Sequence, residues 1–130
     1  MKIAITANGP GLDAPASPIF GRCATYVLVD TETMEYEAIP NPAISAGGGA
    51  GIQAAQFIVE RGAQAVVTGN VGPNAFGVFQ AGGIPVYLFQ EGTVAQAVEA
   101  YKGGQLSSAS DATVSAHTGM GRGRGRGRNR

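Results

Sequence analysis

The stretch that decides the fold is Ala63–Phe79, which reads AQAVVTGNVGPNAFGVF. Within it, Ala65–Thr68 is a short apolar run bounded by turn residues, a pattern typical of a buried strand. A helix-like segment opens at Gly72-Pro73-Asn74, and proline suits the first turn of a helix, where a missing N–H costs nothing. The loop Gly69–Asn74 therefore lies where a strand passes into a helix, and we expect its backbone N–H groups to point outward. In an open α/β sheet, ligands bind at such loops.

The rest of the chain contains the strands and helices that are expected to form a sheet with this strand and to cover it. Three strands are predicted first, and helices and strands then alternate. The expected strands are Ile3–Ala7, Thr25–Asp30, Met34–Ile39, Ala65–Thr68 and Ile84–Phe89, and the expected helices are about Ile52–Arg61, Asn74–Ala81 and one capped by Thr93. This order, βββαβαβα, predicts an α/β domain with a five-stranded mixed sheet and helices on both faces, in a three-layer, ribonuclease-H-like arrangement.

In that arrangement four loops meet at one border of the sheet. The carboxyl ends of the first, third, fourth and fifth strands share this border. The loops expected there are Asn8–Ala16, Asn41–Gly51, Gly69–Asn74 and Gln90–Gly92.

Length and composition limit the class of protein. The chain has 130 residues, enough for one domain with a real core, which we place at residues 1–106. No run of about 18 apolar residues exists, and the first residues show no signal-peptide pattern. The single cysteine fits a reducing compartment, so we expect a cytoplasmic protein without membrane contact.

The formal net charge of zero hides an asymmetry. Five of the nine basic residues are arginines in the last nine positions, so the chain before them is about five units negative. We expect residues 107–130 to form a disordered Gly/Arg-rich tail, because they have too little apolar surface to offset the entropy of ordering. The acidic body disfavours nucleic-acid binding, and the alternative of a nucleic-acid-associated protein depends on the tail arginines alone.

Two glycine-rich turns are candidate anion-binding elements. The run Gly47, Gly48, Gly49 and Gly51 enters a helix, whose unpaired N–H groups can hold an anion. It has neither the Lys-Ser/Thr of a P-loop nor the dinucleotide fingerprint, and a flexible, tightly packed loop is the alternative. The second turn offers Thr68, Gly69, Asn70, Gly72 and Asn74, whose hydroxyl, amides and backbone donors suit an acidic ligand. Its alternative is a plain strand-to-helix turn with Asn74 as the N-cap.

Arg22 and Cys23 are the remaining candidates in the body. Arg22 can pair with an anion, and Cys23 can ligate a soft metal as thiolate, although a lone cysteine is more often a buried small hydrophobe. The single histidine, His117, lies in the tail, so neither a Ser/His/Asp set nor a closed tetrahedral metal site can form. A binding protein is therefore favoured over an enzyme, and any metal arrives within a cofactor or is shared between chains.

Three blocks of sequence resemble a known family. They are GAGIQAAQ at residues 49–56, VTGNVGPNAF at residues 67–76, and GTV with AVEAY at residues 92–101. In this order they resemble the dinitrogenase iron–molybdenum cofactor family, the domain found in NifX-type proteins and at the C-terminus of NifB-type proteins. The resemblance covers about Met1–Leu106.

The resemblance implies a non-enzymatic carrier. Family members of this kind bind the iron–molybdenum cofactor or an iron–sulfur precursor during nitrogenase assembly, so cluster-assembly proteins are the implied partners. The chain departs from the family block Ser-x-His-Phe-Gly-Arg, because Ile19 stands where the histidine would be. That leaves Cys23 as the soft ligand of the body. A small accessory domain for another anionic ligand stays an alternative.

Overall fold

A six-stranded mixed sheet forms the centre of the protein. The structure, a computed structural model, describes residues 1–20, 23–41 and 50–109. Its strands are β1 (Lys2–Ala7), β2 (Thr25–Asp30), β3 (Tyr36–Pro40), β4 (Ala65–Thr68), β5 (Val86–Leu88) and β6 (Ser107–Ser108). Its helices are α1 (Ala50–Glu60), α2 (Pro73–Ala81) and α3 (Val94–Lys102). Every predicted strand and helix is present, and β4 has the predicted bounds.

The strand order is β3-β2-β1-β4-β5-β6. β1, β4 and β5 are parallel, while β2 is antiparallel to both β1 and β3. β1, β3, β4 and β5 therefore end at the same border of the sheet, as predicted. We call this border the carboxyl edge, and we call the opposite border, where β1 and β4 begin and β2 ends, the amino edge.

The prediction of five strands is wrong, because β6 pairs antiparallel with β5. β6 consists of two exposed serines, so it has no alternation of apolar and polar residues that would indicate a strand. It also lies just past the predicted end of the domain at Leu106. A mixed α/β sheet with helices is thus established, whereas its ribonuclease-H-like character stays a prediction.

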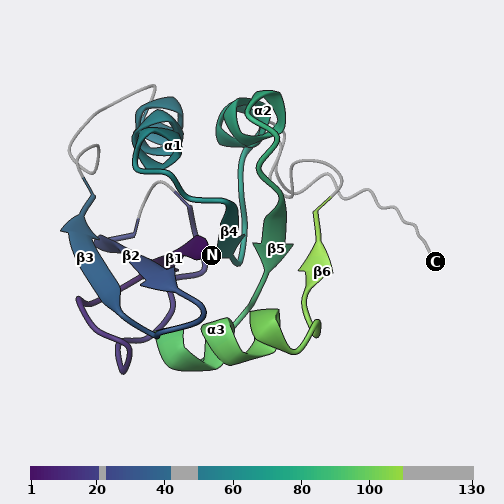
Figure 1. Ribbon diagram of the computed structural model, residues 1–130. Coiled ribbons are helices and arrows are strands. Elements are labelled where there is room, and N and C mark those ends of the chain that lie inside the picture. Colours follow the sequence, from purple (N-terminus) through teal and green to yellow (C-terminus); the bar gives the residue numbers. More distant parts are fainter. Residues whose placement is uncertain (21–22, 42–49, 110–130) are drawn as a thin grey trace.

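Helices cover both faces of the sheet, as expected (Figure 1). α1 and α2 lie side by side on one face, and α3 lies across the other. The central strands β1 and β4 are mostly apolar, as expected of strands that are buried on both faces. Alternate residues of these strands belong to two hydrophobic cores, one on each face of the sheet. Ala4 and Val66 pack beneath α1 and α2, whereas Ile3, Ile5 and Val67 pack against α3.

The start of α2 and the extent of β5 differ from the expectation for local reasons. α2 begins at Pro73 with Gly72 as its N-cap, so Asn74 is not the cap. β5 is shorter than Ile84–Phe89, because Pro85 has no N–H to donate and the Ile84 N–H bonds to the Phe79 carbonyl at 2.8 Å.

A capping box fixes the start of α3. The Gln96 N–H donates to the Thr93 hydroxyl at 3.1 Å, and the Thr93 N–H donates to the Gln96 side chain at 2.8 Å. Two backbone donors at the helix start are satisfied in this reciprocal way. The structure thus confirms the predicted role of Thr93.

We expect the Thr93→Ala variant to lose about 1 kcal/mol of unfolding free energy, because the Gln96 N–H loses its acceptor. Urea denaturation followed by circular dichroism measures this loss. Ser108→Ala serves as the control, since Ser108 is exposed and caps no helix. An equal loss in both variants would contradict the capping role.

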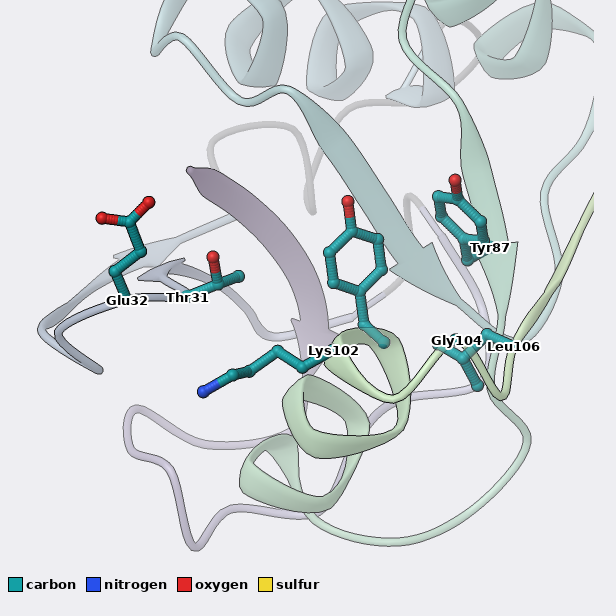
Figure 2. A pocket seen from close by; sticks show the side chains of 7 residues that line it. Thr31, Glu32, Tyr87, Lys102, Gly104 and Leu106 are labelled. Carbon is teal, nitrogen blue, oxygen red and sulfur yellow. The ribbon is translucent and has the colours of Figure 1, made fainter.

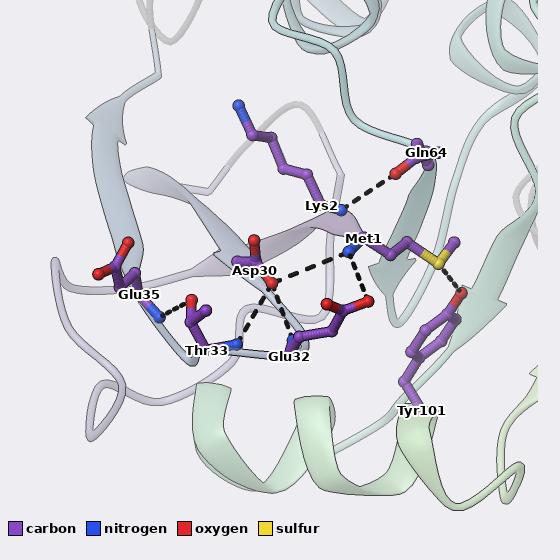
Figure 3. A network of polar contacts seen from close by, with 8 residues as sticks. All are labelled: Met1, Lys2, Asp30, Glu32, Thr33, Glu35, Gln64 and Tyr101. Atoms are coloured by element: carbon purple, nitrogen blue, oxygen red, sulfur yellow. Dashed lines mark hydrogen bonds and ion pairs between the residues drawn. The ribbon is translucent and has the colours of Figure 1, made fainter.

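A network of polar contacts organises the amino edge (Figure 3). The Asp30 carboxylate accepts hydrogen bonds from the Glu32 N–H at 2.8 Å and the Thr33 N–H at 3.3 Å. These bonds fix the turn between β2 and β3. The Glu32 N–H, followed by the Thr33 N–H, holds the pKa of the Asp30 carboxyl below its ordinary value.

Asp30 therefore makes stability depend on pH in the acidic range. Its contribution is complete above the unfolded-state pKa of about 3.9, and it is lost as the pH falls through the lower folded-state pKa. NMR titration of the Asp30 carboxyl carbon should give a lower midpoint in the folded protein than in the urea-unfolded chain. Asp30→Asn should destabilise the protein at pH 7 and have less effect at pH 2. Equal midpoints in the two states would contradict this assignment.

Candidate site at the carboxyl edge

All three described helices begin at the carboxyl edge. None of them has an acidic residue in its first turn. The first turns of α1 and α2 are neighbours, since a Cβ placed on Gly51 would lie 3.8 Å from the Ala75 Cβ. The Gly72 N-cap supplies no side chain to satisfy the start of α2. Two positive helix ends thus lie side by side without a local carboxylate, an arrangement that favours a bound anion.

The segment after β1 crosses the carboxyl edge and joins the other loops. Ala16 donates its N–H to the Gly92 carbonyl at 2.8 Å, and Phe20 donates its N–H to the Asn70 carbonyl at 3.0 Å. Isolated bridges pair Pro15 with Thr93 and Ile19 with Asn70. Three of the four predicted loops therefore meet here. The fourth lies outside the described residues, except for Asn41 at its start and the two residues that open α1.

Buried hydroxyl groups hold this crossing in place. The Thr6 hydroxyl lies 2.7 Å from the Ser17 carbonyl oxygen and 2.9 Å from the Thr68 hydroxyl. Thr6 and Thr68 are each 1% exposed. Thr68, a predicted binding residue, therefore positions the loops from below rather than presenting its hydroxyl to solvent.

Gly69 is required by a close backbone contact. A Cβ at this position would lie 2.7 Å from the Pro18 carbonyl oxygen and 2.9 Å from the Pro18 Cα. Gly69 is buried, and Gln90 donates to its carbonyl at 3.1 Å. The expectation that this turn points its backbone outward is therefore wrong at Gly69. Asn70 is half-buried, and its side-chain amide donates to the Pro18 carbonyl at 3.4 Å.

We expect Gly69→Ala to destabilise the protein by about 1–3 kcal/mol, because the new methyl group must push backbone atoms apart. Gly77 offers a matched control, since a Cβ there meets nothing within 4 Å and the residue lies inside α2. Gly77→Ala should stabilise the protein by up to about 1 kcal/mol. Thermal unfolding of both variants tests the contrast, and destabilisation of the two by similar amounts would refute it.

The other predicted residues fall into three groups. Gly51, Gly72 and Asn74 lie at the starts of α1 and α2, where Asn74 is exposed. Cys23 is fully buried in the core beneath α1 and α2, so the structure places it as a small core residue whose thiol is covered. Arg22, Gly47, Gly48 and Gly49 lie outside the described residues.

Charge is distributed unevenly between the edges. The basic residues of the described part are Lys2, Arg61 and Lys102, and they lie at the start of β1 and at the ends of α1 and α3, toward the amino edge. The remaining basic residue of the domain, Arg22, lies outside the described residues. Among the described residues no group of three or more His, Cys, Asp or Glu side chains could hold a metal ion.

Some residues that shape the candidate site cannot be recognised as site residues from sequence patterns. Thr6, Ser17 and Pro18 position the loops, but their contacts join positions far apart in the chain. Ile19, which stands where the family block has a histidine, is 44% exposed beside Asn70. The departure from the family block thus lies on the surface of the carboxyl edge.

The chain belongs to the family described as dinitrogenase iron-molybdenum cofactor, whose model matches residues 1–104. It is similar to the apo form of the orange protein of Desulfovibrio gigas, with 46% identity and a TM-score of 0.83 over 86% of this chain and 95% of that one. A proposed NifB protein of Thermotoga is 34% identical, with a TM-score of 0.73 over 82% and 91% of the two chains. An uncharacterised protein of Methanocaldococcus jannaschii is 33% identical over 82% of this chain and 89% of its own. No helix in the described part of the chain is long and apolar enough to span a membrane.

Proposed function

We propose that this protein binds an iron–sulfur or iron–molybdenum-type cluster as cargo and carries it during metallocluster assembly, without catalysing a reaction. The cluster would lie at the carboxyl edge of the sheet, and cluster-assembly proteins in the cytoplasm would deliver and receive it. The observation that carries the proposal is the pair of adjacent helix starts, α1 and α2, with no acidic residue in either first turn.

Membership of the family supports a role in cofactor handling. The relative from Desulfovibrio gigas is called the orange protein, and the similar structure is that of its apo form. A coloured bound group is what a metal–sulfur cluster would provide in the present chain.

The chemistry of the edge supports an anionic cargo. Metal–sulfur clusters carry negative charge on their outer sulfides and ligands, and backbone N–H groups at helix starts bind such charge without a buried counter-ion. Gly47, Gly48, Gly49 and Gly51 would supply donors from the start of α1. Gly72, Asn70 and Asn74 would supply them from the start of α2, while Thr68 and Gly69 hold that turn in place.

Arg22 and Cys23 would have separate roles. Arg22 would pair with the charge of the cluster. Cys23 would ligate metal only after local opening of the core, since its side chain is fully buried in this conformation. Mutation of Cys23 therefore distinguishes ligation of the cluster by this thiol from purely non-covalent binding of the cluster at the carboxyl edge.

The test is anaerobic loading with isolated iron–molybdenum cofactor and, separately, with a synthetic thiolate-ligated [4Fe–4S] cluster. Wild-type protein should leave a gel-filtration column with visible absorbance and bound iron. Arg22→Ala should weaken retention about tenfold because a charge-assisted contact is lost. Cys23→Ala should lower the absorbance if the thiol is a ligand, and its melting temperature is measured in parallel.

The matched control is Arg61→Ala, which removes a cation at the far end of α1. Its retention should equal that of the wild type. A wild-type protein that emerges colourless with both clusters would refute cargo binding. Equal losses in the Arg22 and Arg61 variants would show that only net charge matters.

A further inference from the structure

The amino edge contains a cavity that the cluster-carrying role does not use. Its volume is about 450 Å³, within the range of small-molecule sites. The lining residues come from the end of β2, from β5 and from the end of α3 and its following turn; they are Thr31, Glu32, Tyr87, Tyr101, Lys102 and Leu106, with Gly104. The cavity is thus built from segments far apart in the sequence, and it lies at the opposite edge from the starts of the helices.

The apolar wall of this cavity is a pair of tyrosines. Tyr87 and Tyr101 meet edge to face, with ring centroids 5.1 Å apart. The Tyr101 hydroxyl donates to the Met1 Sδ at 3.3 Å, which fixes the outer ring (Figure 3). Burial, reinforced by Tyr87, raises the pKa of Tyr101, so its hydroxyl stays protonated at neutral pH.

Opposite charges flank the tyrosines. Lys102 extends from the end of α3 toward the β2–β3 turn, where Glu32 is placed (Figure 2). In the described part of the chain Lys102 forms no ion pair, and Glu32 pairs only with the Met1 ammonium group at 3.9 Å. The turn that carries Glu32 is held by the Asp30 carboxylate. An aromatic wall and two exposed side chains of opposite charge therefore line one cavity.

We propose that this cavity binds a small zwitterion with an aromatic or apolar body, the chemistry of a free α-amino acid. The ligand's side chain would pack against the rings of Tyr87 and Tyr101, where aromatic contacts add to the burial of apolar surface. Its carboxylate would pair with the Lys102 ammonium and its ammonium with the Glu32 carboxylate. This site is independent of the cluster proposal, because none of its residues belongs to the carboxyl edge.

The test uses three probes in ¹H–¹⁵N NMR titrations of the full chain. L-phenylalanine carries both charges, 3-phenylpropanoate lacks the amine, and phenethylamine lacks the carboxylate. L-phenylalanine should bind most tightly and should shift the amides of Thr31, Glu32, Tyr87 and residues 101–106 in a saturable manner. Absence of saturable shifts, or shifts gathered at the carboxyl edge, would overturn the proposal.

Two exposed charges are then removed one at a time, so the fold is not at risk. Lys102→Gln should weaken 3-phenylpropanoate about tenfold and leave phenethylamine unchanged, and Glu32→Gln should do the reverse. Arg61→Gln and Glu99→Gln are the matched controls, since both residues are exposed and neither lines the cavity. If the controls weaken the probes as much as the site variants do, the binding is unspecific attraction and the assignment fails.

Discussion

The carboxyl edge depends on the buried contact between the ends of the two central strands. Thr6 is the last but one residue of β1 and Thr68 is the last residue of β4, and their hydroxyls lie 2.9 Å apart under the Ser17 carbonyl. Burying hydroxyl groups is costly unless they are hydrogen-bonded, so the contact strongly favours one position of the crossing segment. Once Ser17 is held there, Pro18 must lie against Gly69 and Phe20 must reach Asn70. The surface of the candidate site follows from this contact beneath it.

The direction of the strands then separates two kinds of chemistry. Because α1, α2 and α3 follow β3, β4 and β5, all three helices start at the carboxyl edge, and the positive end of each helix dipole lies there. Their ends, and with them Arg61 and Lys102, lie toward the amino edge. Backbone direction alone therefore makes one edge receptive to anions. The lack of acidic residues in the first turns leaves that property intact.

Sequence patterns predict correctly those features of the fold that neighbouring residues determine. Ala65–Thr68 was predicted with its bounds because β-branched residues between turn residues leave little choice. Thr93 is predicted as a cap because it directly precedes apolar residues at helical spacing, and the structure confirms this role. The strand directions also followed, since crossover helices between strands require a parallel pair.

Predictions failed where distant residues decide the structure. Gly69 reads as an outward-facing turn residue, but Pro18, 51 positions earlier, approaches it and needs the space of a missing Cβ. Asn74 reads as an N-cap, yet Pro73 is already inside the helix, which moves the cap to Gly72. The burial of Cys23 agrees with the alternative of a small core residue, whereas the sequence predicts nothing about the exposure of Ile19. No local pattern reveals which of two nearby apolar side chains turns inward.

α3 shows how the two edges can carry different chemistry on one rigid element. At its start, the N–H groups of Val94 and Ala95 donate to the Ala14 and Leu12 carbonyls at 2.9 Å each, so this helix end is already satisfied by the crossing segment. The proposed anion site depends instead on the starts of α1 and α2, which lie on the other face of the sheet. At its far end, the chain turns through Gly104 in the left-handed region, and Tyr101 and Lys102 are left facing the cavity. Because Val94, Ala97 and Val98 are fully buried between these ends, neither end can shift without disturbing the core. The fold therefore provides two preformed and chemically distinct edges, which is what separate sites for a cluster and for a small zwitterion require.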